Sequence, residues 1–244
     1  MKDKKVIVTG GSRGIGKAIS KRLVDDGYSV VITGINETEL IETATELGVE
    51  GKLLDQRDRE AVKQFSDDWE GDLYALVNNA GICQTLKLEE SGDDPWDDVI
   101  QTNLGGPYFL TKSLVGKISD GGRIVNTASQ LGVVGREDYS AYCASKYGLN
   151  GLTSVWAKEL GYRGVLVNSV LPGWVATEMS VKDAERMATE EGVSYESKMS
   201  ELTAPLELKR FTKPEEIASV VAFLLSEDGS GVTGRNWLVN GPAA

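Results

Sequence analysis

Short runs of apolar and β-branched residues alternate along the chain with longer amphipathic stretches. Continuous apolar runs between helices are typical of parallel strands that are covered on both faces. The pattern predicts strands at Val6–Thr9, Ser29–Thr33, Gly51–Leu54, Leu73–Val77, Arg123–Thr127, Val165–Val170 and Asn236–Val239. It predicts helices at Gly14–Asp26, Glu37–Leu47, Arg57–Asp68, Pro95–Asn103, Pro107–Ser119, Ser140–Gly161 and Pro214–Leu225. This order favours an α/β fold with one doubly wound, Rossmann-type parallel sheet.

The segment Trp174–Leu208 breaks this alternation and carries Met179, Met187 and Met199 among many charged residues. It follows the sixth predicted strand, and doubly wound sheets bind their ligands at the carboxyl ends of the strands. We therefore predict a single domain over residues 1–244, in which residues 174–208 form a small helical lid over the substrate. A surface excursion that contacts no ligand is the alternative.

The charge of the chain argues against several kinds of partner. Its 244 residues carry a net charge of −11 and no basic stripe, so neither nucleic acid nor an anionic membrane surface is expected. The sequence shows no signal-peptide pattern and no apolar run long enough to cross a bilayer. With only two cysteines, Cys83 and Cys143, it fits a reducing, cytoplasmic location.

The chain contains no histidine, which excludes Ser-His-Asp and Cys-His catalysis and makes a metal site unexpected. Tyr142 and Lys146 are four residues apart and share one face of a predicted helix. The cation favours the phenolate, which prepares the tyrosine for proton transfer, and Ser129 offers a hydroxyl for a substrate oxygen. Tyr108 and Lys112 have the same spacing, and we interpret them as a helix surface pair.

A glycine-rich loop, Thr9–Gly16, follows the first strand and opens the first helix. Its glycines allow a tight turn, and the helix N-terminus offers free N–H groups to a pyrophosphate. The stretch also resembles a hydrolase nucleophile elbow, but that chemistry requires a histidine. It nearly matches a P-loop as well, but Ala18 stands where a hydroxyl should hold Mg²⁺.

The residues at the end of the second strand bear on the choice of dinucleotide. An acidic residue there commonly binds the ribose of NAD, but this chain has Gly34, Ile35 and Asn36. Arg13 in the glycine loop is available to pair with the 2′-phosphate of NADP. We therefore predict a preference for NADP(H), with NAD(H) as the alternative.

Several motifs, in this order and spacing, resemble the short-chain dehydrogenase/reductase family in its compact subgroup. They are Thr9–Gly16, Asn78–Gly81, Asn103, Gly122–Ser129, Tyr142–Lys146, Leu171–Gly173 with Thr177, and Val239–Gly241. Pro242 replaces a glycine that is usual in the C-terminal turn of that family.

The resemblance implies that Asn103, Ser129, Tyr142 and Lys146 are catalytic. Tyr142 would be the general acid or base, Ser129 would orient the carbonyl, and Lys146 would hold the nicotinamide ribose. Asn103 would anchor a water, or else only support the fold. The implied cofactor contacts are Gly10, Ser12, Arg13, Gly14, Ile15, Gly16, Gly34, Asn36, Asp55, Gln56, Asn79, Ala80, Gly81, Tyr142, Lys146, Pro172, Gly173, Val175 and Thr177.

The resemblance further implies hydride transfer between NADP(H) and a ketone or secondary alcohol in a homotetramer, as in 3-oxoacyl and polyketide reductases. The predicted substrate pocket comprises Ser129, Gln130, Tyr139, Tyr142, Gly173 and Trp174. Methionines in the lid favour an apolar substrate, and no obvious arginine anchor marks a small anionic acid. The acidic surface disfavours docking of an acidic carrier protein, although a local basic patch around Arg136 is left open for it. The alternatives are an NAD-dependent dehydrogenase similar to 3-hydroxybutyrate dehydrogenases, an epimerase or dehydratase, and a non-catalytic NADP(H) sensor.

Overall fold

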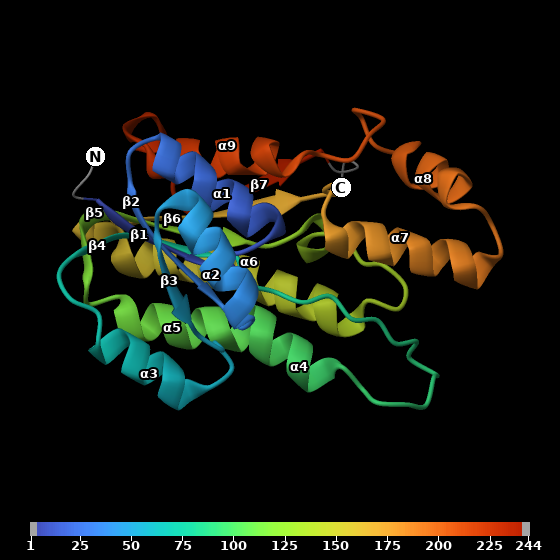
Figure 1. The fold of residues 1–244 in the computed structure, drawn as a ribbon, viewed down its shortest axis with the longest axis horizontal. Coiled ribbons are helices and arrows are strands. Elements are labelled where there is room, and N and C mark those ends of the chain that lie inside the picture. Colours follow the sequence, from blue (N-terminus) through green and yellow to red (C-terminus); the bar gives the residue numbers. More distant parts are fainter. Residues whose placement is uncertain (1–3, 241–244) are drawn as a thin grey trace.

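The computed structural model describes residues 4–240, so Gly241 and Pro242 of the predicted C-terminal turn lie outside the described residues. Seven parallel strands form one sheet in the order β3-β2-β1-β4-β5-β6-β7 (Figure 1). The strands are β1 (Lys5–Thr9), β2 (Ser29–Gly34), β3 (Glu50–Leu53), β4 (Leu73–Asn78), β5 (Ile118–Thr127), β6 (Leu166–Pro172) and β7 (Asn236–Val239). The prediction of a doubly wound parallel sheet is confirmed.

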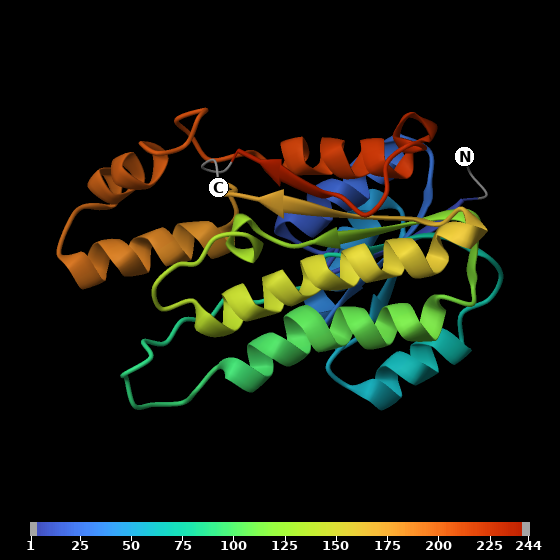
Figure 2. The ribbon, with the colours of Figure 1, turned by 180° about the vertical axis from the view of Figure 1, so that it is seen from behind.

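Helices cover both faces of the sheet (Figures 1 and 2). The main helices are α1 (Gly14–Asp25), α2 (Glu37–Leu47), α3 (Arg59–Asp67), α4 (Trp96–Ile100), α5 (Gly106–Leu114), α6 (Ser140–Leu160) and α9 (Pro214–Leu225). Helices α1, α2 and α9 pack on the face that contains Val6 and Val8, whereas α3, α5 and α6 pack on the face that contains Ile7. Consecutive residues of β1 therefore serve two separate cores, as the alternation of side chains along a strand requires.

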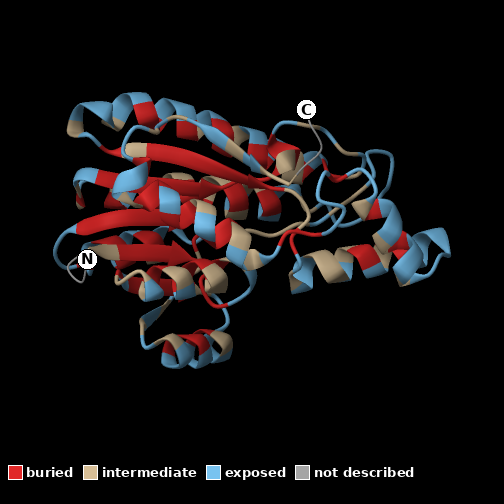
Figure 3. Ribbon diagram, turned by 90° about the horizontal axis from the view of Figure 1, so that it is seen from above, coloured by how far each residue is buried: buried red, intermediate tan, exposed pale blue. Residues whose placement is uncertain are grey.

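Burial follows this layering. The central strands are almost entirely buried, while exposed residues gather on the outer sides of the helices (Figure 3). This is why the strands appear in the sequence as continuous apolar runs rather than as alternating ones. Within residues 4–240, no helix combines the length and the apolarity that crossing a membrane requires.

The largest departure from the predicted elements lies between α4 and β5. The predicted helix Pro107–Ser119 ends at Leu114, and β5 already begins at Ile118, which pairs with Leu73 of β4. The prediction was wrong there because a short apolar run fits a buried strand as well as a helix. In addition, α4 and α5 are not separate, since a π-helical turn over Gln101–Gly105 joins them.

The segment that breaks the alternation forms two helices, α7 (Glu178–Glu191) and α8 (Tyr195–Thr203), beyond the carboxyl ends of the strands (Figures 1 and 2). The two helices contact each other, and Lys198 of α8 pairs with Glu191 of α7 although its side chain is only 2% exposed. Apolar side chains of both helices pack with residues that precede α6. The segment is therefore placed where a lid could act, and its movement remains a prediction.

Candidate active site

The glycine loop between β1 and α1 passes very close to the end of β4. Gly10 has a φ of +61°, and a Cβ on it would lie 2.9 Å from the Cα of Ala80. The Thr9 hydroxyl accepts hydrogen bonds from the backbone N–H groups of Asn79 (2.9 Å) and Ala80 (3.0 Å). A Cβ on Gly16 would lie 2.0 Å from the carbonyl oxygen of Gly10, so only glycine fits at both positions.

The N-terminus of α1 fits a pyrophosphate. The residue before this helix, Arg13, caps it with no side-chain hydrogen bond, whereas Asn36, Asp58 and Thr177 cap α2, α3 and α7. The N–H groups in the first turn of α1 are therefore free of a side-chain cap, and the positive end of the helix dipole lies there. Gly14, Ile15 and Gly16 form this turn, as the predicted cofactor contacts require.

The predicted adenosine contacts have partners of their own within the protein. The Arg13 guanidinium is exposed and lies 3.9 Å from a carboxylate oxygen of Glu178. The side chain of Asn36 accepts a hydrogen bond from the Glu39 N–H (3.2 Å) and caps α2. A Cβ on Gly34 would lie 3.3 Å from the Ser12 hydroxyl, so these two residues do come together beside the glycine loop.

Asp55 and Gln56 also form internal hydrogen bonds at the end of β3. The guanidinium of Arg57 binds both carboxylate oxygens of Asp55 and lowers the pKa of that carboxyl group. Gln56 donates through its amide to the carbonyl oxygens of Thr102 (2.6 Å) and Ala80 (3.3 Å), while its own Oε1 is buried without a partner in the described residues. Both side chains hold loops near the glycine loop, and their contacts with a cofactor remain predictions.

Tyr142 and Lys146 lie one turn apart on α6, as their spacing predicts, and Ser129 follows β5. The Nζ atom of Lys146 lies 5.5 Å from the centroid of the Tyr142 ring and donates to the carbonyl oxygen of Thr127 (2.8 Å). A Cβ on Gly81 would lie 3.5 Å from the same Nζ atom. The end of β4, the end of β5 and α6 therefore converge on one point.

The protonation of this pair differs from the expectation that Lys146 favours the phenolate. Crowded surroundings desolvate Tyr142 and raise the pKa of its phenol, and the nearby Ser129 hydroxyl only partly offsets that increase. Burial also lowers the pKa of Lys146 to about 8. Desolvation is the largest cause of both shifts, because it disfavours the charged form of each group. At neutral pH Tyr142 is therefore a phenol, which is the form that can donate a proton.

Asn103 occupies the π-helical turn between α4 and α5 and is completely buried. Its Nδ2 donates to the carbonyl oxygen of Ile82 (2.8 Å) and to the Ser145 hydroxyl (3.2 Å), and its Oδ1 accepts from the Ile82 N–H (2.9 Å). A Cβ on Gly81 would lie 3.1 Å from that Oδ1. Asn103 therefore fixes the segment after β4 beside Lys146, and its use of a water remains a prediction.

The residues after β6 lead into α7 and pass close to the glycine loop. Pro172 ends β6, and a Cβ on Gly173 would lie 2.3 Å from the carbonyl oxygen of Asn240, so the chain turns where only glycine fits. Val175 is buried and forms a backbone bridge with Thr212. Thr177 caps α7, and a Cβ on Gly14 would lie 3.5 Å from its methyl group. The start of α7 therefore borders the predicted pyrophosphate site.

Of the predicted substrate residues, Ser129 and Tyr139 lie beside Tyr142. The rings of Tyr139 and Tyr142 meet edge to face at 6.4 Å, and Trp174 stacks on Phe211 at 5.2 Å. The Oε1 atom of Gln130 is buried and has no partner in residues 4–240. The Tyr139 hydroxyl, however, donates to a carboxylate oxygen of Asp183 on α7 (2.6 Å), so this group is engaged with the helical segment.

Two charged residues near this site were not among the predicted contacts. Asp183 binds Tyr139 from 44 residues away, a separation that carries no local sequence signal. The Arg136 guanidinium lies 5.1 Å from the Tyr139 ring centroid and 5.3 Å from that of Trp174. A basic residue between Ser129 and Tyr142 was the only available hint of this arrangement.

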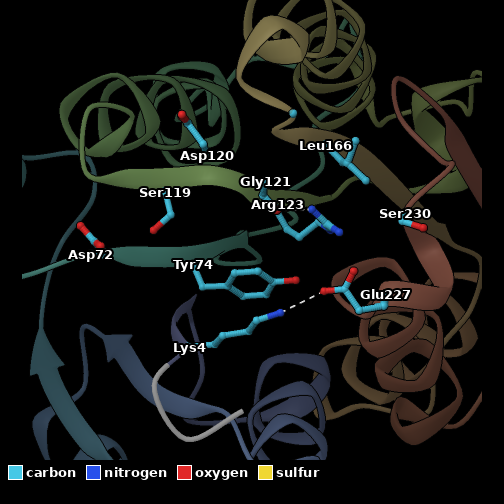
Figure 4. Close-up of a pocket in the computed structure, with 11 residues that line it drawn as sticks. Lys4, Asp72, Tyr74, Ser119, Asp120, Gly121, Arg123, Leu166, Glu227 and Ser230 are labelled. Atoms are coloured by element: carbon cyan, nitrogen blue, oxygen red, sulfur yellow. Dashed lines mark hydrogen bonds and ion pairs between the residues drawn. The ribbon is translucent and has the colours of Figure 1, made fainter.

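A cavity of about 630 Å³ opens at the opposite end of the sheet, where Lys4, Tyr74, Arg123, Leu166 and Glu227 are among the lining residues (Figure 4). It lies at the amino ends of the strands, whereas doubly wound sheets bind their ligands at the carboxyl ends. The groups suited to proton transfer are at that other end. We therefore assign the candidate active site to the region around Tyr142 and not to this cavity.

Comparisons with known proteins agree with this geometry. The model of the short chain dehydrogenase family matches residues 4–188. The 3-oxoacyl-(acyl-carrier-protein) reductase FabG of Haemophilus influenzae is 35% identical over 249 residues, which cover 99% of this chain and 98% of the relative. A diacetyl reductase of Staphylococcus aureus that forms (S)-acetoin is 33% identical over 251 residues, with 98% and 97% covered.

Among solved structures, a variant of the actinorhodin polyketide ketoreductase with NADPH superposes with a TM-score of 0.91 at 34% identity. The match covers 98% of this chain and 96% of that one. The family model, the full-length relatives and the shared fold lead to the same assignment. This chain belongs to the short-chain dehydrogenase/reductase family of NAD(P)-dependent oxidoreductases.

Proposed function

We propose that this protein transfers a hydride between NADP(H) and a ketone or secondary alcohol, with Tyr142 as the general acid or base. The observation that carries the proposal is the convergence of Tyr142, Lys146 and Ser129 at the carboxyl end of β5, beside an uncapped helix N-terminus. Similarity to 3-oxoacyl, diacetyl and polyketide reductases supports a carbonyl substrate.

In the reduction of a ketone, each of these side chains has its own role. The Ser129 hydroxyl orients the carbonyl, and Tyr142, kept protonated by its raised pKa, donates a proton to the carbonyl oxygen. Lys146 holds the ribose next to the nicotinamide and returns a proton to Tyr142. Nicotinamide bound between the glycine loop and Tyr142 would supply the hydride. Oxidation of an alcohol reverses these proton movements.

Three observations support NADP(H) as the preferred cofactor. No carboxylate at the end of β2 opposes a 2′-phosphate, since Gly34, Ile35 and Asn36 occupy that position. The exposed Arg13 guanidinium makes only a long, 3.9 Å contact with Glu178 and is free to turn to a phosphate. NADPH is also present in the solved polyketide ketoreductase. An NAD-dependent secondary-alcohol dehydrogenase is the second candidate, because Glu178 competes for Arg13.

Residues 174–208 would act as the lid over the substrate in this proposal. Support comes from the proximity of Thr177 to Gly14 of the glycine loop, and from the hydrogen bond between Tyr139 and Asp183. The presence of both Tyr142 and Lys146 argues against a sensor without catalytic activity.

We also propose that the protein acts in the cytoplasm as a homotetramer, with no nucleic acid or membrane partner. Large apolar side chains on α4 and α6, among them Trp96 (46%), Tyr147 (47%) and Val155 (48%), are unusually exposed, which favours contact with further copies. Size-exclusion chromatography with light scattering tests the assembly. Elution as a 26.3 kDa species would rule the tetramer out.

The activity is tested by following the absorbance of the reduced nicotinamide, with NADPH and separately with NADH, against β-keto esters, diketones and simple ketones. Faster oxidation of NADPH supports the proposal. A preference for NADH supports the second candidate. Tight binding of cofactor without oxidation by any member of the panel would favour the sensor.

A further inference from the structure

Arg136 is held between two aromatic rings at the edge of the candidate active site. It lies in the loop before α6, and its guanidinium carbon is 5.1 Å from the ring centroid of Tyr139 and 5.3 Å from that of Trp174. Its Nη2 atom donates to the sulfur of Met187 on α7 at 3.5 Å. Its three contacts therefore come from the loop before α6 (Tyr139), from the residue that follows the turn after β6 (Trp174) and from α7 (Met187).

These contacts leave most of the hydrogen-bonding capacity of the guanidinium unused. A guanidinium has five N–H donors, and the acceptor it has here, a thioether, is a weak one. Within residues 4–240 no carboxylate lies within ion-pair distance of Arg136, although Glu137 and Asp138 follow it in the chain. Asp183, whose carboxylate binds the neighbouring Tyr139, is already engaged by the Tyr139 hydroxyl and by Arg186.

The position of Arg136 suits recognition of the far end of a substrate. The ring of Tyr139 links Arg136 to Tyr142, since its centroid lies 5.1 Å from the guanidinium carbon and 6.4 Å from the Tyr142 ring centroid. A guanidinium packed between rings keeps its planar edge of N–H groups available, and that edge matches a carboxylate in a bidentate manner. A substrate whose carbonyl lies at Tyr142 would extend a short chain toward this edge.

The geometry points to Arg136 as the anchor for a carboxylate, so that the substrate class is an oxo acid anion whose ketone and carboxylate are separated by a short apolar chain. The inference rests on the function proposed above and narrows it. The sequence showed no obvious arginine anchor for a small anionic acid, and the inference assigns that role to Arg136. Met187 and the rings of Tyr139 and Trp174 would line the path of the apolar chain.

The test compares acetoacetate and levulinate with their methyl esters, which have the same ketone without the charge. The measured quantity is the ratio of kcat/KM for each acid to kcat/KM for its ester, in the wild type and in Arg136→Gln and Arg136→Lys variants. Because charge-assisted bidentate bonds are strong, we expect Arg136→Gln to lower the ratio about 10- to 100-fold for the acid that reaches the guanidinium. Arg136→Lys keeps the charge without the planar fork and should give an intermediate ratio.

The matched control is Arg59→Gln. Arg59 on α3 also lies over a ring, 4.1 Å from the centroid of Phe109, and its loss changes the net charge equally. That variant should keep the wild-type ratio. Equal losses for acid and ester in Arg136→Gln would overturn the anchor, because they indicate a structural role. If the wild type has the same kcat/KM for each ester as for its acid, the anchor is overturned while the proposed function stays intact. Reduction of neither, nor of any other ketone, would refute the proposed function and the anchor with it.

Discussion

The ammonium group of Lys146 lies 5.5 Å from the ring centroid of Tyr142, yet its hydrogen bond goes to the backbone of Thr127. The lysine is therefore held close to the phenol without being paired to it. Because desolvation acts on both groups, the pKa of Tyr142 rises while that of Lys146 falls to about 8. The two pKa values thereby move apart, so an ammonium at Lys146 gives up its proton readily to a tyrosinate at Tyr142.

Replacement of Tyr142 by Phe removes the proposed proton donor and little else. We expect kcat for ketone reduction to fall about 100- to 10,000-fold, as is usual when a general acid is lost. Binding of NADPH, measured by the fluorescence of the reduced cofactor, should persist, because the glycine loop is unchanged.

The chain offers a matched control for this variant in Tyr108→Phe. Tyr108 is also followed four residues later by a lysine, Lys112, whose Nζ lies 5.8 Å from the ring centroid. That pair lies on α5, away from the glycine loop, so the control should retain nearly normal turnover. Comparable turnover in both variants would refute the role assigned to Tyr142.

Replacement of Lys146 by Met should stabilise the protein at neutral pH while abolishing turnover. Burial lowers the pKa of Lys146 from 10.5 to about 8, so between those values the unfolded chain binds more protons than the folded one. Stability of the wild type therefore rises with pH across that window, and below it the buried charge lowers the free energy of unfolding by about 1–3 kcal/mol.

The Met variant lacks this cost at every pH. Its melting temperature should exceed that of the wild type at neutral pH, and the difference should shrink as the pH approaches 10.5. Thermal melts across this range, followed by circular dichroism, measure both effects. A variant that is less stable at neutral pH would show that the hydrogen bond to Thr127 more than offsets the cost of burying the charge.

The sequence was sufficient for the features that depend on local chemistry. The apolar runs identified all seven strands found in residues 4–240. The glycines of the first loop are required because a Cβ would not fit; on Gly10 it would lie only 2.9 Å from the Ala80 Cα. The spacing of Tyr142 and Lys146 put both on one face of α6. These features share a cause, because periodicity and steric limits act within a few residues.

The features that were not predicted depend on contacts between distant segments. Nothing near Tyr139 indicates that its hydroxyl binds Asp183, which is 44 residues away. The start of β5 at Ile118 was missed because its pairing with Leu73 decides between strand and helix. The fall in the pKa of Lys146 likewise comes from burial, which a linear pattern does not give.

Arg13→Ala should discriminate between the two dinucleotides. If the guanidinium binds the 2′-phosphate, its loss should raise the Kd for NADPH about 10-fold or more, as expected for a hydrogen bond to a charged group. The Kd for NADH should change little, because NADH has no phosphate at that position. Fluorescence titration with each cofactor measures both constants.

Two neighbouring variants sharpen this result. Lys17→Ala removes a nearby cation that is already paired with Glu46 at 2.7 Å and should leave both constants unchanged. Glu178→Gln removes the carboxylate that lies 3.9 Å from Arg13 and should leave NADPH binding equal or tighter. Equal weakening of both cofactors by Arg13→Ala would instead support a dinucleotide site without preference for the phosphate.

The hydrogen bond between Tyr139 and Asp183 makes the proposed lid testable. Tyr139→Phe keeps the ring that packs against Arg136 and removes only the 2.6 Å bond to α7. We expect faster backbone hydrogen exchange over residues 178–203 in this variant, because the bond ties these helices to the residue before α6. A higher KM for ketone with little change in kcat should accompany it.

Glu190→Gln is the matched control, because Glu190 binds Arg186, as Asp183 does, but makes no contact with Tyr139. Its exchange over residues 178–203 should stay close to that of the wild type. In the wild type, NADPH together with an unreactive substrate analogue should slow the exchange of the same residues, since a lid closes on its ligand. Exchange that is indifferent both to ligands and to Tyr139→Phe would show that α7 and α8 are a fixed surface excursion.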